Sequence, residues 1–529
     1  MLDSLPKHAD ASLRSEEQQQ RFLTVAAVIA SLPLLPPRWL PMVDLPQHEL
    51  VADALARHLS GVSSGATDAN LFTYNAGFEF AALLLRPLVG PVGGGHVVLA
   101  AGAAGLTLAI ARMRRLLGAS PWPALLAPLL TLHYAASWGF ANFTLGVPLL
   151  FVVVGDALEL HDGRRGRAFL ARATSCALAL ALTHVLATLA ACVALALIAI
   201  PSLFLARSAS SLRRWATAAI PLLMASAFDV SAFLWARAHP HTPWENSWAE
   251  GRHDGPVARI TSVVSNTLGA SSDRADVIIL AALTAALVAL VVRAPREARR
   301  RDTTAVVSAF LPIGFATLYL VIPTVFIATF YVGERFAALA FLAAIATVPC
   351  PPPSRTLRGL FVAASIGATI RLELVVRAAD ASARDGIAVL DAIDPNASLV
   401  PVNRDLRVDG FARSPLRHLF ARHALRAGAV VGYSFLRFES PPVRARLPSP
   451  RPELPPGFEG DARAFDATEA WARGWDAFFV VDAPARTPAT DEEHRQALFG
   501  GVYQDIRLIA RRGRFSAYRW ASRRTVDTR

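Results

Sequence analysis

Cysteine is scarce in this chain of 529 residues, which contains only Cys176, Cys192 and Cys350. All three lie in or at the ends of hydrophobic runs, and none has CxxC spacing. Disulfide frameworks and thiolate metal sites need several cysteines at suitable spacing, so the sequence argues against both. We expect these residues to be small members of a hydrophobic core.

The chain also lacks the motifs of common soluble catalysts. It has no Gly-rich phosphate loop of the G-x-G-x-x-G or Walker type and no G-x-S-x-G nucleophile elbow. Chemistry on a nucleotide-activated sugar at the cytoplasmic side is therefore not expected.

Lysine is nearly absent, because Lys7 is the only one, and arginine therefore dominates the formal net charge of +12. Much of the arginine stands in short clusters between hydrophobic runs. That arrangement is typical of topology control in a membrane protein rather than of a phosphate-binding groove. The positive charge therefore does not predict a nucleic-acid partner.

Long hydrophobic runs are what the chain has in abundance: 53% of its residues are hydrophobic and 18% are charged, with a mean hydropathy of +0.38. Runs such as 168–205 and 275–292 approach or exceed the ~20 residues that cross a bilayer. The sequence predicts an α-helical polytopic membrane protein of about 11 spans. These are expected near 22–41, 97–113, 121–137, 143–160, 168–184, 186–206, 213–234, 275–293, 303–322, 334–350 and 357–376.

The arginine clusters also predict the orientation of these spans. With the spans above, all the arginine-rich connections fall on the side of the N-terminus, as the positive-inside rule requires; they are 111–118, 161–172, 207–214, 293–302 and 354–358. Residues 1–21 mix acids with arginine and are long for a signal-peptide n-region, so we expect them to be a disordered cytoplasmic tail. The first outer loop is then 42–96, and the C-terminal part lies outside the cell membrane.

Residues 78–95 are apolar, but counting them as a span would invert all later basic loops. The segment is short, carries Arg86 and is interrupted by Pro87 and Pro91. We therefore interpret it as a re-entrant or surface-lying element of the first outer loop. The alternative is a true span paired with a second short span.

The C-terminal part, 377–529, differs in composition from the membrane domain, 22–376. It is rich in proline, arginine and acids and has short alternating apolar runs. The stretch "QDIRLIARRGRFSAYRW" predicts two strands around an Arg-Gly turn. We expect a soluble α/β domain of about 150 residues, a typical domain size.

Asp44 directly follows the first expected span, and His48 stands four residues later. Helical periodicity over 46–60 gives an interfacial helix whose apolar face meets the membrane, with Glu49 and Asp53 pointing to water. A carboxylate at the membrane surface suits a general base that acts on an acceptor hydroxyl. The alternative is that Asp44 caps the helix that Pro46 opens.

This layout resembles the GT-C superfamily of integral-membrane glycosyltransferases. The resemblance covers most of the chain as layout, and as residues it depends on "VDLPQH" (43–48), "LFTYNAGFEFAALLLRPL" (71–88) and "SWGFANFTLGVPLL" (137–150). The Asp-x-Pro-x-His pattern is similar to a bacterial branch of the superfamily. The family usually carries a paired acidic motif in the first loop, whereas Asp44 has no acid beside it.

The resemblance implies a bacterial inner-membrane enzyme that moves a sugar from a polyprenyl-phosphate donor to an extracytoplasmic glycan, lipid or protein. Asp44, assisted by His48, would deprotonate the acceptor, and polyprenyl phosphate would leave with inversion at the sugar. Arg335 would bind the phosphate, with Arg86 as a second choice; a surface salt bridge is the alternative for Arg335.

Further residues could line such a site. Trp138 and Asn142 could contact the sugar, although an interfacial aromatic belt also explains the aromatics here. Asp229, inside an expected span, could line the cavity, since buried membrane carboxylates tend to do so. The sequence requires no cofactor, and a divalent metal at His239, His241, His253 and Asp254 is an alternative that stays open.

Other functions also stay open. A transporter for lipid-linked glycans should show inverted repeats, and none is visible. A polysaccharide polymerase would have its chemistry in long loops between spans rather than beside the first span. The absent paired acid also allows a GT-C-like scaffold without catalytic activity.

Overall fold

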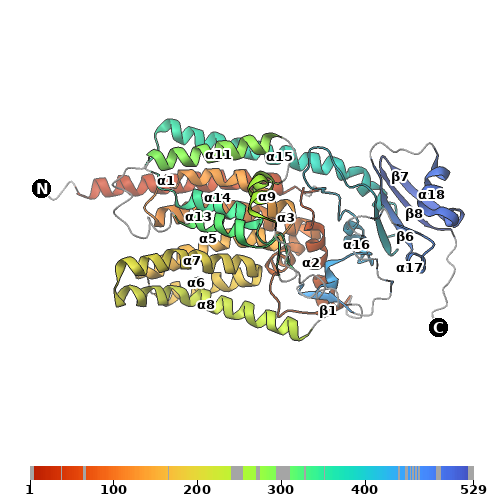
Figure 1. Ribbon diagram of the computed structural model, residues 1–529, viewed down its shortest axis with the longest axis horizontal. Helices are drawn as coiled ribbons and strands as arrows, with labels where there is room; N and C mark the ends of the chain where they lie inside the picture. Colours follow the sequence, from red (N-terminus) through yellow and green to blue (C-terminus); the bar gives the residue numbers. More distant parts are fainter. Residues whose placement is uncertain are drawn as a thin grey trace.

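The computed structural model describes residues 5–521 apart from 37–38, 63–66, 165, 240–253, 270–273, 294–309, 327–328, 351, 439–440, 447–450, 453, 455–457, 459–461, 463–464 and 484–489. Most of the chain forms a bundle of long helices. A small sheet with short helices lies at the end of the molecule opposite to the N-terminus (Figure 1).

Long helices build the bundle, and several could cross a membrane. The helices are α1 (Leu5–Ser31), α3 (Gly77–Leu116), α5 (Ala141–His161), α6 (Arg167–Thr183), α7 (Val185–Ala206), α8 (Ala209–Ala238), α11 (Arg274–Arg293), α13 (Leu311–Val321), α14 (Arg335–Thr347) and α15 (Arg355–Asp391). Among the described residues, five helices are long and apolar enough to span a bilayer: α3, α5, α7, α8 and α15.

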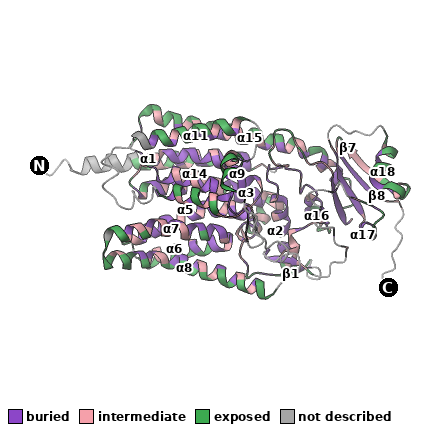
Figure 2. Ribbon diagram, in the orientation of Figure 1, coloured by how far each residue is buried: buried purple, intermediate pink, exposed green. Residues whose placement is uncertain are grey.

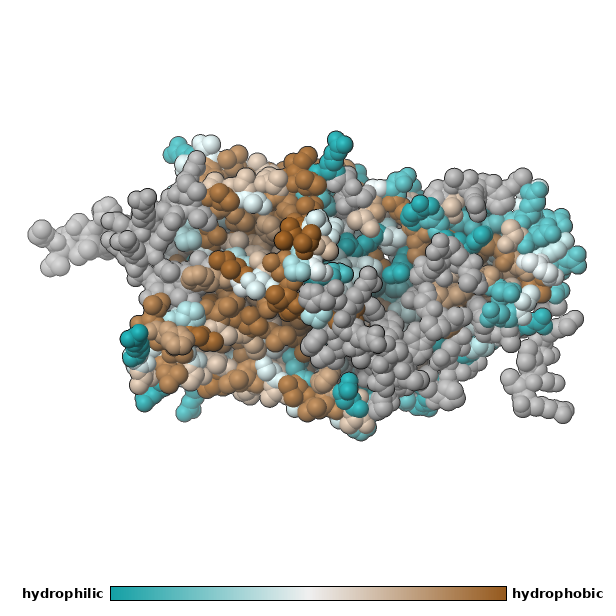
Figure 3. Space-filling view, in the orientation of Figure 1, coloured by the Kyte–Doolittle hydropathy of each residue, from teal (hydrophilic) through white to brown (hydrophobic). Residues whose placement is uncertain are grey.

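The outer faces of these helices are apolar. Figure 2 shows exposed positions along the outside of the bundle, and these include Leu223, Leu234 and Ile370. Figure 3 shows hydrophobic residues over the bundle and hydrophilic residues toward the C-terminal end. An apolar surface of this extent requires lipid around it. The chain is an integral membrane protein.

Short elements complete the bundle: η1 (Leu32–Leu34), η2 (Trp122–Leu130), α4 (Tyr134–Ser137), α9 (Pro256–Thr261), α10 (Val263–Thr267), β2 (Val325–Phe326) and β3 (Thr329–Phe330). The α-helix expected at 121–137 is not formed: the segment contains the 3-10 helix η2 and the one-turn helix α4 instead. Pro121, Pro123 and Pro128 lack the N–H that an α-helix needs. The number of 11 spans is not confirmed, and part of the span expected at 303–322 lies outside the described residues.

Two further expectations change in the structure. The described part of the N-terminal tail, from Leu5 onward, belongs to helix α1, which starts before the first expected span. The segment 78–95 forms the first part of α3, and Gly90, with φ 78°, separates it from the following span. Only glycine adopts that backbone conformation without strain, and Pro91 next to it interrupts the hydrogen-bond ladder.

The C-terminal domain contains a four-stranded sheet with the order β4-β6-β8-β7. Its strands are β4 (Leu399–Asn403), β6 (Ala477–Val481), β7 (Ile506–Arg512) and β8 (Phe515–Trp520), with helices and turns α16 (Ala421–Ala427), η4 (Phe435–Arg437), α17 (Ala470–Arg473), α18 (Asp491–Phe499) and η5 (Gly500–Asp505). β4 and β6 are parallel, and the other pairs are antiparallel. The two strands predicted around Gly513 are confirmed as β7 and β8.

The helix α15 joins the two parts of the molecule. It continues without a break past residue 376, where the membrane domain was expected to end, to Asp391. Its last turns pack under the sheet, where Ala379, Ala383 and Val389 share a core with Phe479 and Phe515. The domain boundary therefore lies inside a helix.

The first loop is tied to the C-terminal domain. Strand β1 (Thr67–Ala69) pairs with β5 (Val443–Ala445), and helix α2 (Leu45–Leu59) contacts α16 and β5. Glu49 and Asp53, expected to face water, are therefore buried. The sequence pattern of α2 was read against a membrane on one side and water on the other, whereas protein covers both faces.

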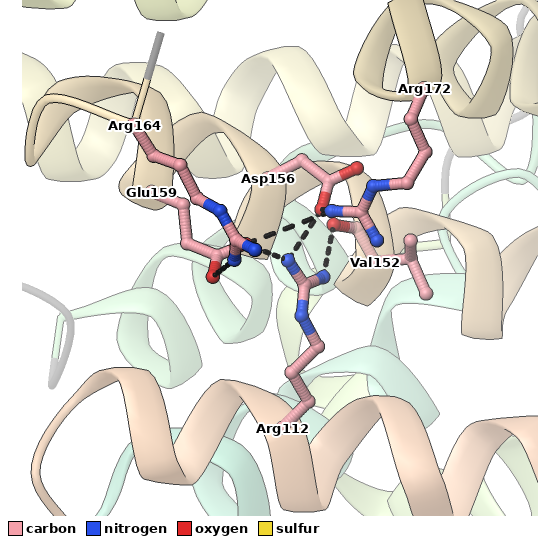
Figure 4. Close-up of polar contacts among 6 residues, drawn as sticks. All are labelled: Arg112, Val152, Asp156, Glu159, Arg164 and Arg172. Carbon is pink, nitrogen blue, oxygen red and sulfur yellow. Dashed lines mark hydrogen bonds and ion pairs between the residues drawn. The ribbon is translucent and has the colours of Figure 1, made fainter. Parts of the chain in front are cut away.

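At the other end of the bundle, an ion-pair network joins three helices (Figure 4). Arg112 of α3 donates to Asp156 at 2.5 Å and also to Glu159, both on α5. Arg172 of α6 donates to Asp156 at 2.6 Å, and Arg164 donates to Glu159 at 2.7 Å. These arginines belong to the expected cytoplasmic clusters. Their ion pairs with Asp156 and Glu159 fix the positions of the arginine side chains.

Candidate active site

Asp44 stands at the start of α2 and is fixed by its backbone. Its N–H donates to the carbonyl of Trp138 at 2.9 Å, and the N–H of Val43 donates to the carbonyl of Ser137 at 3.1 Å. Although Asp44 is the N-cap residue of α2, its side chain makes no capping hydrogen bond. Asp44 thus occupies the N-cap position that the alternative interpretation expects, but its carboxylate does not cap the helix and can make another contact.

Gly139 explains why the aromatic-Gly-aromatic pattern lies beside this acid. Its φ is +82°, and a Cβ built on it would lie 2.6 Å from the backbone nitrogen of Leu45 and 2.9 Å from the Cα of Asp44. Any larger residue would have to push this backbone away. The motif "SWGFAN" thus positions the carboxylate through the main chain.

Aromatic rings form one wall next to Asp44. Trp138 stacks on Tyr331 with ring centroids 4.6 Å apart and lies parallel to Phe140 at 6.3 Å. Tyr331 has φ 56°, which is uncommon for a residue with a side chain. Two guanidinium groups of the C-terminal domain lie over this wall, with Arg413 4.1 Å from the ring of Tyr134 and Arg417 5.9 Å from the ring of Trp138.

Arg335, the first residue of α14, approaches the same place from the bundle. Its guanidinium lies 4.0 Å from the ring centre of Phe140, and one terminal nitrogen is 3.0 Å from Nε2 of His184. The charge of Arg335 interacts with the carboxylates of Asp44 and Glu334. The structure therefore places the predicted base and the predicted phosphate-binding cation beside the same aromatic rings.

His48 lies one turn after Asp44 and is engaged by a buried acid. Its Nδ1 is 2.5 Å from Oε1 of Glu79, and Oε2 of Glu79 accepts from Asn142 at 2.8 Å. Asn142 uses its second amide proton on the carbonyl of Asn75, and its oxygen accepts from the N–H of Phe78. Because Asn142 is 2% exposed, its expected sugar contact is replaced by a structural role that connects α2, α3 and α5.

Arg86 and Asp229 have other polar neighbours than Asp44. Arg86 donates to Asp53 at 2.6 Å, nine residues beyond Asp44 and so roughly 13 Å farther along α2. Arg86 therefore lies away from Asp44 and is engaged by another acid. Asp229 is buried on α8 beside Thr188 and Cys192 of α7, and Thr188 lies one turn along α7 from His184, which contacts Arg335.

Several residues at the centre had no predicted role. Glu334 directly precedes Arg335, so the sequence alone could have indicated it. Its Oε1 lies 3.0 Å from the Thr324 hydroxyl and 3.6 Å from Arg259. Tyr331 stands four residues before Arg335 in the sequence. Arg413, Arg417 and His418 come from a segment whose sequence indicated only a soluble domain, and no local pattern marks them.

The metal alternative gains no support from the part of the chain that can be described. There, no group of three His, Cys, Asp or Glu side chains is arranged to hold a metal ion. Asp254 accepts a hydrogen bond from Thr324 at 2.9 Å, and the His239 Nδ1 lies 2.9 Å from the carbonyl of Trp235. His241 and His253 lie outside the described residues.

Comparison with known proteins gives a match at the level of structure alone. No protein-family model and no curated protein sequence matches the chain. The crystal structure of ArnT from Cupriavidus metallidurans in the apo state superimposes with a TM-score of 0.58 at 13% identity, covering 95% of this chain and 98% of ArnT. The same ArnT bound to undecaprenyl phosphate gives a TM-score of 0.55 at 12% identity, covering 94% and 97%.

The fold is that of ArnT. ArnT is a glycosyltransferase of the GT-C type, so the resemblance stated from the sequence is confirmed as a resemblance of fold. The match to ArnT includes both the membrane bundle and the C-terminal domain, since it extends over nearly the whole of each chain. At this identity the likeness to ArnT gives the architecture, and the chemistry has to be argued from the residues at the site.

Proposed function

We propose that the protein is an inverting membrane glycosyltransferase that moves a sugar from a polyprenyl-phosphate donor to a hydroxyl-bearing acceptor. The observation that carries this proposal is that Asp44 and Arg335 both lie beside one aromatic wall, Asp44 through its hydrogen bond to the backbone of Trp138 and Arg335 over the ring of Phe140. A carboxylate and a guanidinium at one site supply the two charges that the reaction needs. The ArnT structure with undecaprenyl phosphate supports a lipid-linked donor for this fold.

The reaction assigns each residue a step. Asp44 accepts the proton of the acceptor hydroxyl as that oxygen forms a bond to the anomeric carbon. The bond between this carbon and the phosphate oxygen breaks, and the polyprenyl phosphate leaves with both electrons. Arg335 stabilises the charge on the departing phosphate. Trp138 and Tyr331 offer ring faces on which a sugar can stack, and His48 is held beside the base by Glu79.

The decisive experiment measures transfer from radiolabelled polyprenyl-phosphate sugars by the wild type and by Asp44→Asn. General base catalysis contributes on the order of a hundredfold to ten-thousandfold, and we expect the variant to lose at least a hundredfold. Asp68→Asn is the matched control, because this acid lies in the same loop with its side chain 52% exposed. Unchanged transfer by Asp44→Asn would remove Asp44 from the mechanism.

A second outcome would favour the scaffold instead. If the wild type binds undecaprenyl phosphate but transfers no sugar from any donor tested, the protein has kept the fold without the activity. The acid missing beside Asp44 is the feature that motivates this alternative.

We also propose that the N-terminus is cytoplasmic and that the C-terminal domain and the active site lie on the outer side of a bacterial inner membrane. The arginine network of Figure 4 and the C-terminal domain lie at opposite ends of the bundle (Figure 1), which supports this orientation. Glu492→Cys and Gly166→Cys, each in a chain without the native cysteines, test it. A membrane-impermeant thiol reagent added outside should label the first and not the second; the reverse would invert the orientation and contradict the use of an outward-facing donor.

A further inference from the structure

His418 brings the C-terminal domain into direct contact with the proposed base. It lies between β4 and α16 and is 3% exposed. Its Nδ1 is 3.2 Å from Oδ1 of Asp44. The two atoms are close without being aligned as a hydrogen bond, and neither ring nitrogen of His418 has a hydrogen-bond partner within the described part of the chain.

The imidazole is held in place by aromatic rings. It stacks on Tyr433 at 5.2 Å and 16° and meets the edges of Phe420 and Phe435 at 5.8 and 6.1 Å. A buried polar ring without a partner is uncommon, because desolvation without a hydrogen bond costs free energy. The rings surround His418 on its other sides, and the Asp44 carboxylate is the acceptor that lies within reach.

We propose that His418 is a positioning residue for Asp44, so that the C-terminal domain completes the active site. A hydrogen bond from Nδ1 to Oδ1 would fix the carboxylate and leave Oδ2 directed at the acceptor hydroxyl. Hydrogen bonds between catalytic groups are often longer in a free enzyme and tighten when substrate binds. This inference rests on the proposed function, because it assigns a task to His418 only if Asp44 is the base.

Other charged and titratable groups also face Asp44 and must be kept constant in any test. Arg335 and Tyr331 interact with its charge from the bundle, and Arg417 faces Tyr331 from the C-terminal domain. None of these is changed in the variants below. An altered rate can therefore be assigned to the contact between His418 and Asp44.

The experiment compares His418→Phe with His418→Asn in the full-length protein. Phenylalanine keeps the ring stacking and removes the donor, whereas the asparagine amide places an N–H near the position of Nδ1. Hydrogen bonds to charged groups are strong enough that we expect His418→Phe to lower kcat roughly ten- to a hundredfold with little change in KM for the donor lipid. His418→Asn should recover part of that loss.

His423→Phe is the matched control. His423 is fully buried in α16 of the same domain, and its Nε2 faces the carbonyl of Ala397 at 2.8 Å, away from Asp44. We expect its kcat per folded molecule to stay within about twofold of the wild type, since it loses only a structural hydrogen bond. Binding of undecaprenyl phosphate checks that each variant is folded. If His418→Phe does not fold, His418→Asn tests the inference through the pH dependence of its kcat, which should differ from that of the wild type. An unchanged pH dependence would contradict the inference.

The outcomes separate this inference from the proposed function. Unchanged kcat in His418→Phe, or equal losses in His418→Phe and His423→Phe, would make His418 a packing residue and overturn the inference, even if Asp44→Asn abolishes transfer. Full activity in Asp44→Asn would instead overturn the proposed mechanism. Loss in His418→Phe with partial recovery in His418→Asn supports the inference.

Discussion

Gly139 packs directly against the backbone of Asp44, with no room for even one additional carbon atom between them. Three residues of the chain, Ser137, Trp138 and Gly139, thereby fix the place of the proposed base through two hydrogen bonds and one close contact. The acid depends on this neighbour for its position as much as on its own helix.

Gly139→Ala should therefore both destabilise the protein and displace the base. The left-handed backbone alone costs about 1–2 kcal/mol for a residue with a Cβ, and the steric contact with Asp44 adds to it. We expect a lower unfolding midpoint in detergent and a loss of kcat larger than the folded fraction explains. Gly367→Ala, in α15 with no atom near its Cβ position, is the control and should be as stable as the wild type or slightly more so. Equal behaviour of the two variants would contradict the positioning role.

Arg335 is expected to carry the affinity for the lipid phosphate. Arg335→Lys keeps the charge but loses the planar fork and the stacking on Phe140, so binding of undecaprenyl phosphate should weaken about tenfold, and more in Arg335→Gln. Equilibrium binding to the purified protein in nanodiscs measures this. Arg86→Gln should keep its affinity, because Arg86 is paired with Asp53. A loss confined to Arg86→Gln would place the phosphate elsewhere.

The network of Figure 4 should contribute to stability and not to catalysis. Asp156 is 1% exposed and accepts from both Arg112 and Arg172. Arg112 keeps Glu159 as a partner when Asp156 is changed. Hydrogen bonds to charged groups contribute about 1.5–3 kcal/mol, so Asp156→Asn should lower the unfolding midpoint while kcat per folded molecule is unchanged. Arg164→Ala, with its side chain 63% exposed, should cost less than about 1 kcal/mol. A change of kcat in Asp156→Asn would link this end of the bundle to the active site.

Glu49 should make the stability depend on pH. Burial raises the pKa of Glu49 well above its ordinary value, and the positive charge of Arg422 opposes that rise. The folded state then binds more protons than the unfolded state between the two pKa values, so stability falls as the pH rises through this window. Glu49→Gln removes the ionisation. We expect it to raise the unfolding midpoint near neutral pH and to have no such effect below pH 4.5, the ordinary pKa of the side chain. Thermal unfolding across pH measures this, with the exposed Glu492→Gln as the control; equal midpoints at all pH values would contradict it.

Sequence patterns predicted those features that depend on neighbouring residues. The alternation around Gly513 gave β7 and β8, and the apolar runs predicted the membrane bundle. Asp44 and Arg335 could be named because their positions, just after one expected span and at the start of another, are visible in the sequence and because the resemblance to GT-C enzymes gave them roles. Each of these features can be recognised from a short stretch of sequence, because it does not depend on contacts with distant segments.

The remaining features depend on contacts between distant segments. Asn142 was interpreted as a sugar ligand because its partners, Glu79 and Phe78, lie in another helix. Glu49 was expected in water because nothing in α2 indicates that α16 covers it. His418 has no motif of its own, and its meaning arises only when the C-terminal domain docks on the start of α2.

One consequence of α15 concerns how substrates reach this centre. A proline-free helix of 37 residues, about 55 Å long, runs from the bundle into the core beneath the sheet, so the domain that carries His418 cannot swing aside without bending a continuous rod. If the proposed function is correct, lipid and acceptor would then reach Asp44 from the side, between the bundle and the C-terminal domain.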